Sequence, residues 1–263
     1  GQSYHYLQVQ EFRRPEFEVT TSVGEGPFFA LEFAQFTVEA KYYAGGALPN
    51  ADVTWLVTSQ ESTYRPPNWD DFNFGVWVPW WRSYSKGSFR FEPSYDSPSS
   101  SNSYAGVTDA SGKHTLRVDF ETPDPPKPTS ITAEGTVMDV NRQAWAGSST
   151  ILVHPAELYV GLRTNRTFYE KGQPINVDAI VVDLDGNAVV DRPIEIKLVR
   201  LDWRYARGEW IEEEVDVQTC TVGSLSEPVS CKFEAREGGQ HRLSATITDA
   251  RGRKNYSEMT RWV

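Results

Sequence analysis

The sequence predicts an all-β protein made of two tandem antiparallel β-sandwiches, and three observations support this prediction. Short runs rich in Val, Ile, Thr and aromatic residues mostly alternate apolar with polar side chains, as strands with one buried face do. Clusters of Gly, Asp and Pro separate these runs as turns. Two stretches of sequence also recur at fixed offsets, which is typical of a repeated domain.

The predicted strands follow one another along the whole chain. Those of the first half are FEVTTSV, QFTVEAKYY, DVTWLVTS, HTLRVDF, TAEGTVMDV and STILVHP. Those of the second half are LYVGLRT, INVDAIVVD, IEIKLVR and HRLSATITD. The turns between them read AGGALPN, DASGK, DLDGN, REGGQ and DARGR. No stretch of a dozen residues has the periodicity of an amphipathic helix.

The repeat defines the domains. Residues 17–58, shifted by 141 positions, align without gaps with residues 158–199, and residues 134–153, shifted by 110, align with 244–263. The first copy therefore carries a net insertion of 31 residues relative to the second. We expect one sandwich at 13–154 with an insertion at about 59–104, and a plain sandwich of immunoglobulin or fibronectin type III size at 155–263. Residues 1–12 are interpreted as the end of a preceding repeat or its linker.

The insertion holds the aromatic-rich stretch NWDDFNFGVWVPWWRSY at 68–84. One interpretation is structural: a long insertion stays ordered by burying its own aromatic rings, and its prolines stiffen it. The other is functional: exposed tryptophan faces stack on sugars or peptides. We prefer the structural interpretation, with Trp77, Trp80 and Trp81 as candidate contacts to a neighbouring domain.

Cys220 and Cys231 are the only cysteines. They lie at the ends of β-type runs with Gly and Pro between them, so a hairpin would place them opposite one another. Cross-strand Cβ atoms lie about 4.5–5.5 Å apart, close to what a disulfide requires. We predict that they are bonded, which implies an oxidising compartment. The alternative is a pair of free buried thiols.

Composition excludes several classes of function. The net charge of −10 argues against a nucleic-acid partner, and no apolar run approaches the roughly 20 residues of a membrane helix. The histidines at 5, 114, 154 and 241 are scattered singly, so no metal site is expected. Asp183 and Asp185 resemble half of a calcium loop but fit a hairpin turn better. The acidic run Glu212–Glu214 is interpreted as solvating a strand or loop. With no hydrolase, phosphate-loop or zinc motif, no catalytic residue and no cofactor are predicted.

Several segments resemble bacterial α2-macroglobulins. EFRRPEFEV is similar to the linker and first strand that connect two macroglobulin-like domains in that family. LRTNRTFYEKGQPINVDAIVVDLDGNAV resembles the opening of another such domain, with its turn at Tyr169 to Gly172. ADVTWLVTSQESTYRPPNWDDFNFGVWVPWW resembles the aromatic-rich segment of the large members. The resemblance covers nearly the whole chain.

This resemblance implies macroglobulin-like sandwiches within a large protein that traps proteases. Members are cut in an exposed bait segment, change shape and cage the protease, and many bond it through a Cys-x-Glu-Gln thioester. Cys220 is followed by TVG and Cys231 by KFE, so neither fits the thioester motif. SYDSPSSSNSY at 94–104 is the best bait candidate, yet it is interpreted as a loop tip.

The resulting hypothesis is a non-catalytic structural segment that holds neighbouring domains in register, with His154–Pro155–Ala156 as a stiff hinge. Its partners would be adjacent macroglobulin-like domains of the same chain, and proteases only through the full-length protein. Its location would be periplasmic or extracellular. The alternatives are a carbohydrate-binding or adhesive module that uses the Trp-rich loop, and a surface repeat that spaces other modules.

Overall fold

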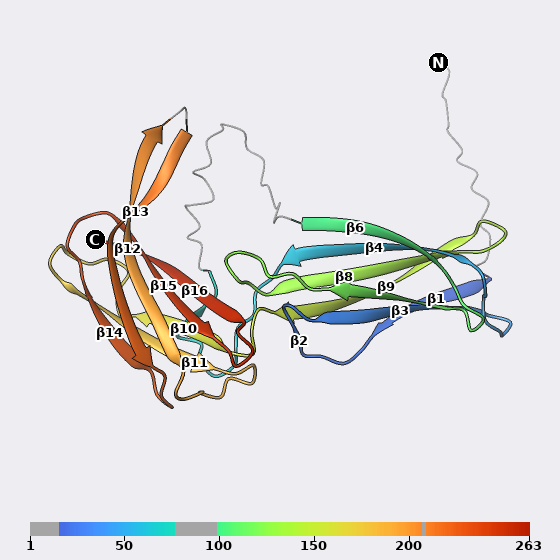
Figure 1. The fold of residues 1–263 in the computed structure, drawn as a ribbon, viewed down its shortest axis with the longest axis horizontal. Helices are drawn as coiled ribbons and strands as arrows, with labels where there is room; N and C mark the ends of the chain where they lie inside the picture. The colour runs from blue at the N-terminus through green and yellow to red at the C-terminus, as the bar shows by residue number, and fades with distance from the viewer. Residues whose placement is uncertain (1–15, 77–98, 207–208) are drawn as a thin grey trace, which may run out of the picture.

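The computed structural model describes residues 16–76, 99–206 and 209–263, and these ranges form strands and turns (Figure 1). The fold class is all-β, as predicted. Within the described ranges no helix has the length and apolar character needed to cross a membrane. Trp77, Trp80 and Trp81, residues 1–12 and residues 94–98 lie outside the described residues.

The first sandwich has a three-stranded and a five-stranded sheet. The small sheet has the order β1-β3-β7 and the large sheet the order β2-β9-β8-β4-β6, and all pairs except β2 with β9 are antiparallel. The strands are β1 (Phe17–Val23), β2 (Phe28–Phe29), β3 (Phe33–Tyr42), β4 (Asp52–Glu61), β6 (Ser99–Val107), β7 (Lys113–Asp119), β8 (Thr129–Met138) and β9 (Ala144–His154). Alternate residues face the core, where Phe17, Phe36 and Trp55 have no exposed surface.

The second sandwich has two four-stranded sheets. Their orders are β14-β11-β10-β5 and β13-β12-β15-β16. The strands are β10 (Tyr159–Thr164), β11 (Pro174–Val182), β12 (Pro193–Ala206), β13 (Glu209–Gly223), β14 (Val229–Glu234), β15 (Gln240–Thr248), β16 (Lys254–Trp262) and β5 (Asn73–Phe74). Strand β5 comes from the chain between β4 and β6, so the first sandwich supplies one strand to the second.

Strand pairing recurs in the two sandwiches at the offsets read from the sequence. Glu18 pairs with Lys41, and the residues 141 positions later, Tyr159 and Val182, pair as well. Ser130 pairs with Leu152, as do the residues 110 positions later, Gln240 and Trp262. Thr54 pairs with Thr136, and Glu195, 141 positions after Thr54, pairs with Thr246, 110 positions after Thr136. The two sandwiches therefore share the registers of these strands.

The disulfide between Cys220 and Cys231 is present, as predicted, but it does not join two strands of one hairpin. Cys220 on β13 pairs with Ile196, whereas Cys231 on β14 pairs with Val177 in the other sheet. The bond therefore ties the two sheets of the second sandwich together beside their common core. Hairpin reasoning from sequence gave the right bond for the wrong reason, since β14 crosses to the other layer.

One segment interpreted as a loop tip is a strand, and the acidic run lies on a strand. Residues 99–104 belong to β6, an edge strand that pairs with β4 from Asp52 to Gln60, so the interpretation of this part of 94–104 as a loop tip is wrong. The serine-rich sequence of β6 does not predict a strand, because it lacks the alternation of apolar and polar residues by which strands are recognised. The acidic run Glu212–Glu214 lies on β13 opposite β12. Lys197 binds Glu214 at 2.5 Å and Arg242 binds Glu212 at 2.9 Å.

Candidate functional site: the junction between the two sandwiches

The link from β9 to β10 is buried. His154 is 7% exposed, and Pro155 and Ala156 are buried beside it. The His154 Nδ1 and the Tyr159 hydroxyl are hydrogen-bonded at 2.8 Å, across the link from one sandwich to the other. The sequence predicted a stiff hinge at 154–156, and the structure places these residues in a packed interface.

Aromatic rings surround His154 and set its ionisation. Tyr64 meets its ring edge to face, with centroids 4.7 Å apart, and Phe29 lies at 6.0 Å. Burial disfavours the imidazolium form and lowers the pKa of His154 to about 4. Burial likewise raises the pKa of the Tyr159 hydroxyl well above its ordinary value. Both groups are therefore neutral at pH 7.

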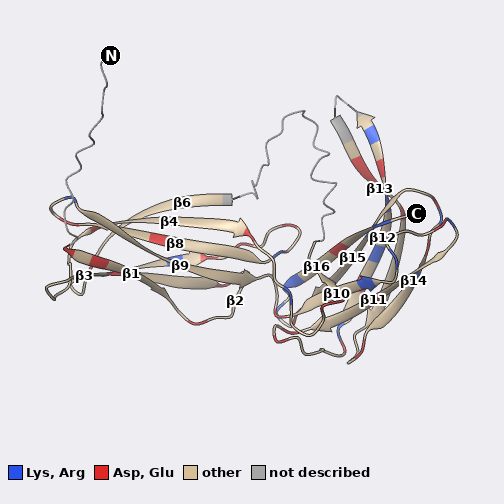
Figure 2. Ribbon diagram, turned by 180° about the vertical axis from the view of Figure 1, so that it is seen from behind, with Lys and Arg blue, Asp and Glu red and all other residues tan. Residues whose placement is uncertain are grey.

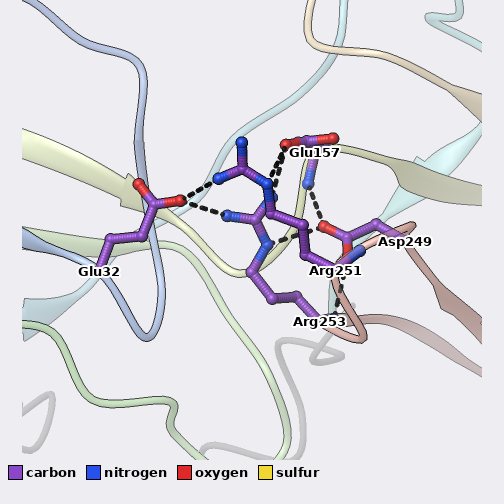
Figure 3. Close-up of polar contacts among 5 residues, drawn as sticks. All are labelled: Glu32, Glu157, Asp249, Arg251 and Arg253. Carbon is purple, nitrogen blue, oxygen red and sulfur yellow. Dashed lines mark hydrogen bonds and ion pairs between the residues drawn. The ribbon is translucent and has the colours of Figure 1, made fainter.

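A buried arginine holds carboxylates from three segments (Figure 3). The Arg253 side chain is 3% exposed and donates to Asp249 at 2.8 Å, to Glu157 at 2.7 Å and to Glu32 at 3.0 Å. Asp249 is on the β15–β16 turn, Glu157 is in the link, and Glu32 is on the first sandwich. Arg251 adds a 2.7 Å contact to Glu32. One guanidinium therefore joins both sandwiches and the link.

Asp249 stays ionised beside Arg253, and Phe29 packs against the Arg253 guanidinium. Desolvation by burial raises the pKa of Asp249, but hydrogen bonds from the Arg253 backbone and side chain, from Glu157 and from Arg251 outweigh it and hold the pKa below the ordinary value. The Arg253 guanidinium also lies 4.3 Å from the centroid of the Phe29 ring on the first sandwich. Asp249 therefore stays ionised, and its charge is paired rather than solvated.

Residues 62–76, which we call the strap, leave β4 and lie on the second sandwich. Its strand β5 pairs antiparallel with β10, Asn73 opposite Leu162 and Phe74 opposite Gly161. Further on, the Gly75 amide donates to Ser257 Oγ at 2.8 Å, and the Glu258 amide donates to the Gly75 carbonyl at 3.0 Å. The strap thus completes one sheet of the second sandwich and contacts the other.

The strap's aromatic rings pack against the second sandwich, and Phe72 is the buried one. Phe72 is 2% exposed and packs with Tyr159, Ile180 and Val182. The Trp69 indole donates to the Gly186 carbonyl at 2.9 Å, and the Tyr64 hydroxyl donates to the Leu184 carbonyl at 2.6 Å. The sequence predicted that the inserted rings bury one another. The described rings pack mainly on the following sandwich instead, because the strap is too short to enclose a core.

Ion pairs hold the outer side of the strap on the second sandwich. Arg163 on β10 forms ion pairs with Asp71 of the strap and, at 2.8 Å, with Asp178 on β11. Its guanidinium also lies 4.5 Å from the centroid of Phe72. Hydrogen bonds to Asp178 and Asp71 raise the pKa of Arg163, so this pairing persists over the whole range in which the carboxylates are ionised.

Two glycines of the second sandwich make room for the strap. A Cβ at Gly161 would lie 2.7 Å from a carbon of the Phe74 ring. A Cβ at Gly186, where φ is +79°, would lie 2.2 Å from the Pro67 carbonyl oxygen. Sequence reasoning took Gly186 only as part of a turn, and the close approach of another segment explains why both positions suit glycine.

Several of the described acidic, histidine and cysteine residues take part in structural contacts. Among the described residues, no three His, Cys, Asp or Glu side chains come together as a group that could hold a metal ion. Asp183 Oδ1 accepts the amides of Asp185 and Asn187 within the predicted turn. His114 accepts a hydrogen bond from the Trp55 indole at 3.0 Å inside the first sandwich. The arrangement binds segments of this chain to one another.

The sequence is similar to two curated proteins. No family model matches the chain. The "Circularly permutated Ras protein 2" of Dictyostelium discoideum is 26% identical over 206 residues, 75% of this chain. The "Alpha-2-macroglobulin homolog" of Nostoc sp. is 19% identical over 268 residues, 98% of this chain. The chain spans only 5% and 13% of the lengths of these two proteins.

Solved structures of bacterial alpha-2-macroglobulins have the same fold. The native conformation of the Escherichia coli protein matches 96% of this chain and 16% of that one, with a TM-score of 0.58 and 12% identity. The Salmonella protein reacted with methylamine matches 97% of this chain and 17% of that one, with a TM-score of 0.56 and 11% identity. The resemblance to bacterial α2-macroglobulins seen in the sequence is confirmed at the level of the fold.

Proposed function

We propose that this chain is a non-catalytic structural segment of a bacterial α2-macroglobulin-like protease-trapping protein, in which it holds two neighbouring sandwiches in one orientation. The junction carries this proposal. Domains of one chain usually move relative to one another because the interface between them is small and polar. Here a strap, a buried link and an ionic cluster join the two sandwiches.

The contact energies favour a stiff junction. Burial of one large apolar side chain such as Phe72 contributes roughly 1.5–3 kcal/mol. Opening the junction would also break the ion pairs that Glu32 forms with Arg253 and Arg251. A protein that changes shape on cutting needs parts that move as rigid bodies, and a two-sandwich block is such a part.

We also propose the domain organisation of the block. Residues 13–154, with an insertion at about 59–104, and residues 155–263 would be tandem macroglobulin-like modules, and residues 1–12 would be the end of a preceding one. The shared strand registers support this division. The disulfide supports a periplasmic or extracellular location, because such bonds persist in oxidising compartments.

Protease trapping by the full natural polypeptide that contains this chain tests the proposal. Trypsin is added, and its activity is followed on casein and on a small chromogenic peptide. A caged protease no longer hydrolyses casein but still hydrolyses the small peptide, which can reach it inside the cage. We expect this pattern in the wild type and a smaller caged fraction in the Phe72→Ala, Arg253→Met double variant.

Gly24→Ala is the control, because nothing lies within 4 Å of a Cβ at that position. A wild type that leaves casein hydrolysis intact would exclude the trapping role, and a double variant that cages as well as the control would exclude the structural one. A glycan array tests the carbohydrate-binding alternative: sugar binding that is lost in Trp80→Ala or Trp81→Ala would replace the scaffold proposal.

A further inference from the structure

Strands β12 and β13 extend beyond the second sandwich. Leu201 is the last residue of β12 that pairs with β15, and the next residues pair only with β13 in the part of the chain that the structure describes. The described residues 202–206 and 209–213, which we call the arm, form a two-stranded ribbon that projects from the sandwich (Figure 1). Isolated two-stranded ribbons are only marginally stable in water.

The arm leaves the sandwich at the end where the last strand finishes. Gln240 pairs with Leu201 at the base of the arm and with Trp262 near the end of β16. The first sandwich has the same arrangement. There Thr129 pairs with Glu61 at the base of the strap and with Val153 near the end of β9.

The strap and the arm are therefore equivalent extensions of equivalent strands. The strap continues β4 beyond its pairing with β8, and the arm continues β12 beyond its pairing with β15. Each leaves its sandwich at the end where the last strand, β9 or β16, finishes. The strap occupies the sandwich that follows it along the chain. The arm stands where it would reach the part of a polypeptide that follows β16.

The surface of the arm fits a docking role. Trp203 is 46% exposed, Tyr205 61% and Ile211 41%. Trp203 and Tyr205 are two positions apart and so lie on one face of the ribbon, whereas Ile211 is paired with Arg204 and lies on the other face. Arg204 and Glu213 form an ion pair at 2.7 Å, and the arm carries both acidic and basic residues (Figure 2). Aromatic rings flanked by charge are typical of protein interfaces.

The direction of the arm is set at its base. The register of β12 with β13 shifts between Leu198 and Arg200, and Asp216 on the facing strand has a φ of +49°. Such a bulge bends the paired strands. Asp216 Oδ1 is bound by Arg236 at 3.1 Å, which braces the bend against the β14–β15 connection. The arm is thus held at an angle to the sheet.

We propose that the arm is the docking element for a further β-sandwich that follows this segment in the same polypeptide. Trp203 and Tyr205, which share one face of the ribbon, would pack on that sandwich, as Phe72 and Trp69 of the strap pack on the second one. This inference rests on the proposed function, because it needs tandem modules. It adds the surface through which one module holds the next.

Hydrogen exchange of the arm tests the inference. Amide exchange over 202–206 and 209–213 is measured by mass spectrometry in the chain 1–263 and in the natural polypeptide that continues through the following domain. We expect exchange to slow by at least about tenfold in the longer chain, since docking removes the frayed states of the ribbon. The turn at 109–112, at the far end of the first sandwich, serves as the internal reference.

A matched pair of variants makes the test specific. Trp203→Ser with Tyr205→Ser should abolish the added protection in the longer chain, whereas Leu225→Ser, a change at another exposed apolar residue, should keep it. Unchanged exchange beside a folded following sandwich would overturn this inference alone. A following region with no β-sandwich by circular dichroism and proteolysis would overturn the proposed function. Protection that rises with the concentration of chain 1–263 would assign the arm to a second copy and also overturn the inference.

Discussion

Two glycines at the junction stand where another segment of the chain packs too closely for a Cβ. Gly161 lies in a strand, where glycine is usually unfavourable because it has no side chain to pack. Here the missing Cβ leaves space for the Phe74 ring and for Ile180 Cγ2. A Cβ at this position would lie 2.7 Å from the ring and 3.1 Å from Ile180 Cγ2. The same logic applies to Gly186 and the Pro67 carbonyl.

Gly161→Ala should therefore destabilise the protein by about 1–3 kcal/mol, the usual cost of overpacking. The added methyl group pushes Phe74 and β5 away from β10. Urea unfolding followed by tryptophan fluorescence measures the loss. Gly223→Ala is the control, since nothing lies within 4 Å of a Cβ there, and equal stabilities of the two variants would contradict the account.

His154 makes stability depend on pH in a defined window. Its pKa in the folded chain is about 4, against about 6.5 when unfolded. Between these values the unfolded chain binds a proton that the folded chain excludes, so the free energy of unfolding falls as the pH falls from about 6.5 to about 4. The loss reaches about 3 kcal/mol at most, and above pH 6.5 this histidine contributes no slope.

His154→Asn should flatten this part of the stability curve. Asn keeps a polar group near the Tyr159 hydroxyl but does not titrate. Urea unfolding of both proteins at pH 7.5, 5.5 and 4.5 gives the comparison, and the difference between them isolates His154 from the carboxylates. Parallel curves would show that the imidazole is solvated rather than buried.

Elements at the junction act across domain boundaries. Strand β5 is only two residues long, yet it adds an edge strand to the sheet of the second sandwich. Main-chain pairing of this kind supplies affinity while the side chains on either side supply specificity. Phe72 and Trp69 provide that specificity here.

The disulfide is an element-scale constraint on the second sandwich. It closes a short loop, with a sequence separation of 11, between strands of opposite sheets. Cys220→Ala with Cys231→Ala should lower the free energy of unfolding by about 2–4 kcal/mol, because the bond restricts the unfolded chain. Urea unfolding with and without a reductant measures this, and a wild type that is insensitive to the reductant under unfolding conditions would contradict it.

At the scale of the whole molecule, the two sandwiches should behave as one rigid body. Arg253 is the connection whose loss should matter most, because its removal leaves the buried Asp249 carboxylate without its ion-pair partner, a change that typically costs about 3–5 kcal/mol. Phe72 is the main apolar contact of the strap.

Small-angle X-ray scattering tests this rigidity. The wild type should fit a single arrangement of the sandwiches, whereas Arg253→Met with Phe72→Ala should show a larger radius of gyration and a spread of arrangements. Arg117→Met is the matched control: Arg117 also pairs with a carboxylate and covers an aromatic ring, Phe33, but within one sandwich at the surface. A double variant that scatters like the control would refute a stiff junction.

Local sequence patterns predicted many of the strands and turns of the fold. The alternation in FEVTTSV predicted a strand whose observed bounds are Phe17–Val23, and the turns at 109–113 and 183–187 lie between strands as expected. These features depend on side-chain period and turn chemistry within a few residues, so they can be read without knowing what lies elsewhere.

The sequence by itself determined that the chain is all-β, where most of its strands lie and which cysteines pair. Only the tertiary structure decided what the inserted aromatic residues contact. Trp69 reaches Gly186, 117 positions away, and Arg253 reaches Glu32, 221 positions away. Such contacts depend on how two finished sandwiches are placed against one another, and no periodicity within either one encodes that placement. The physical reason is that strand formation is governed by neighbours in sequence, whereas the junction is governed by complementarity between surfaces that exist only after folding.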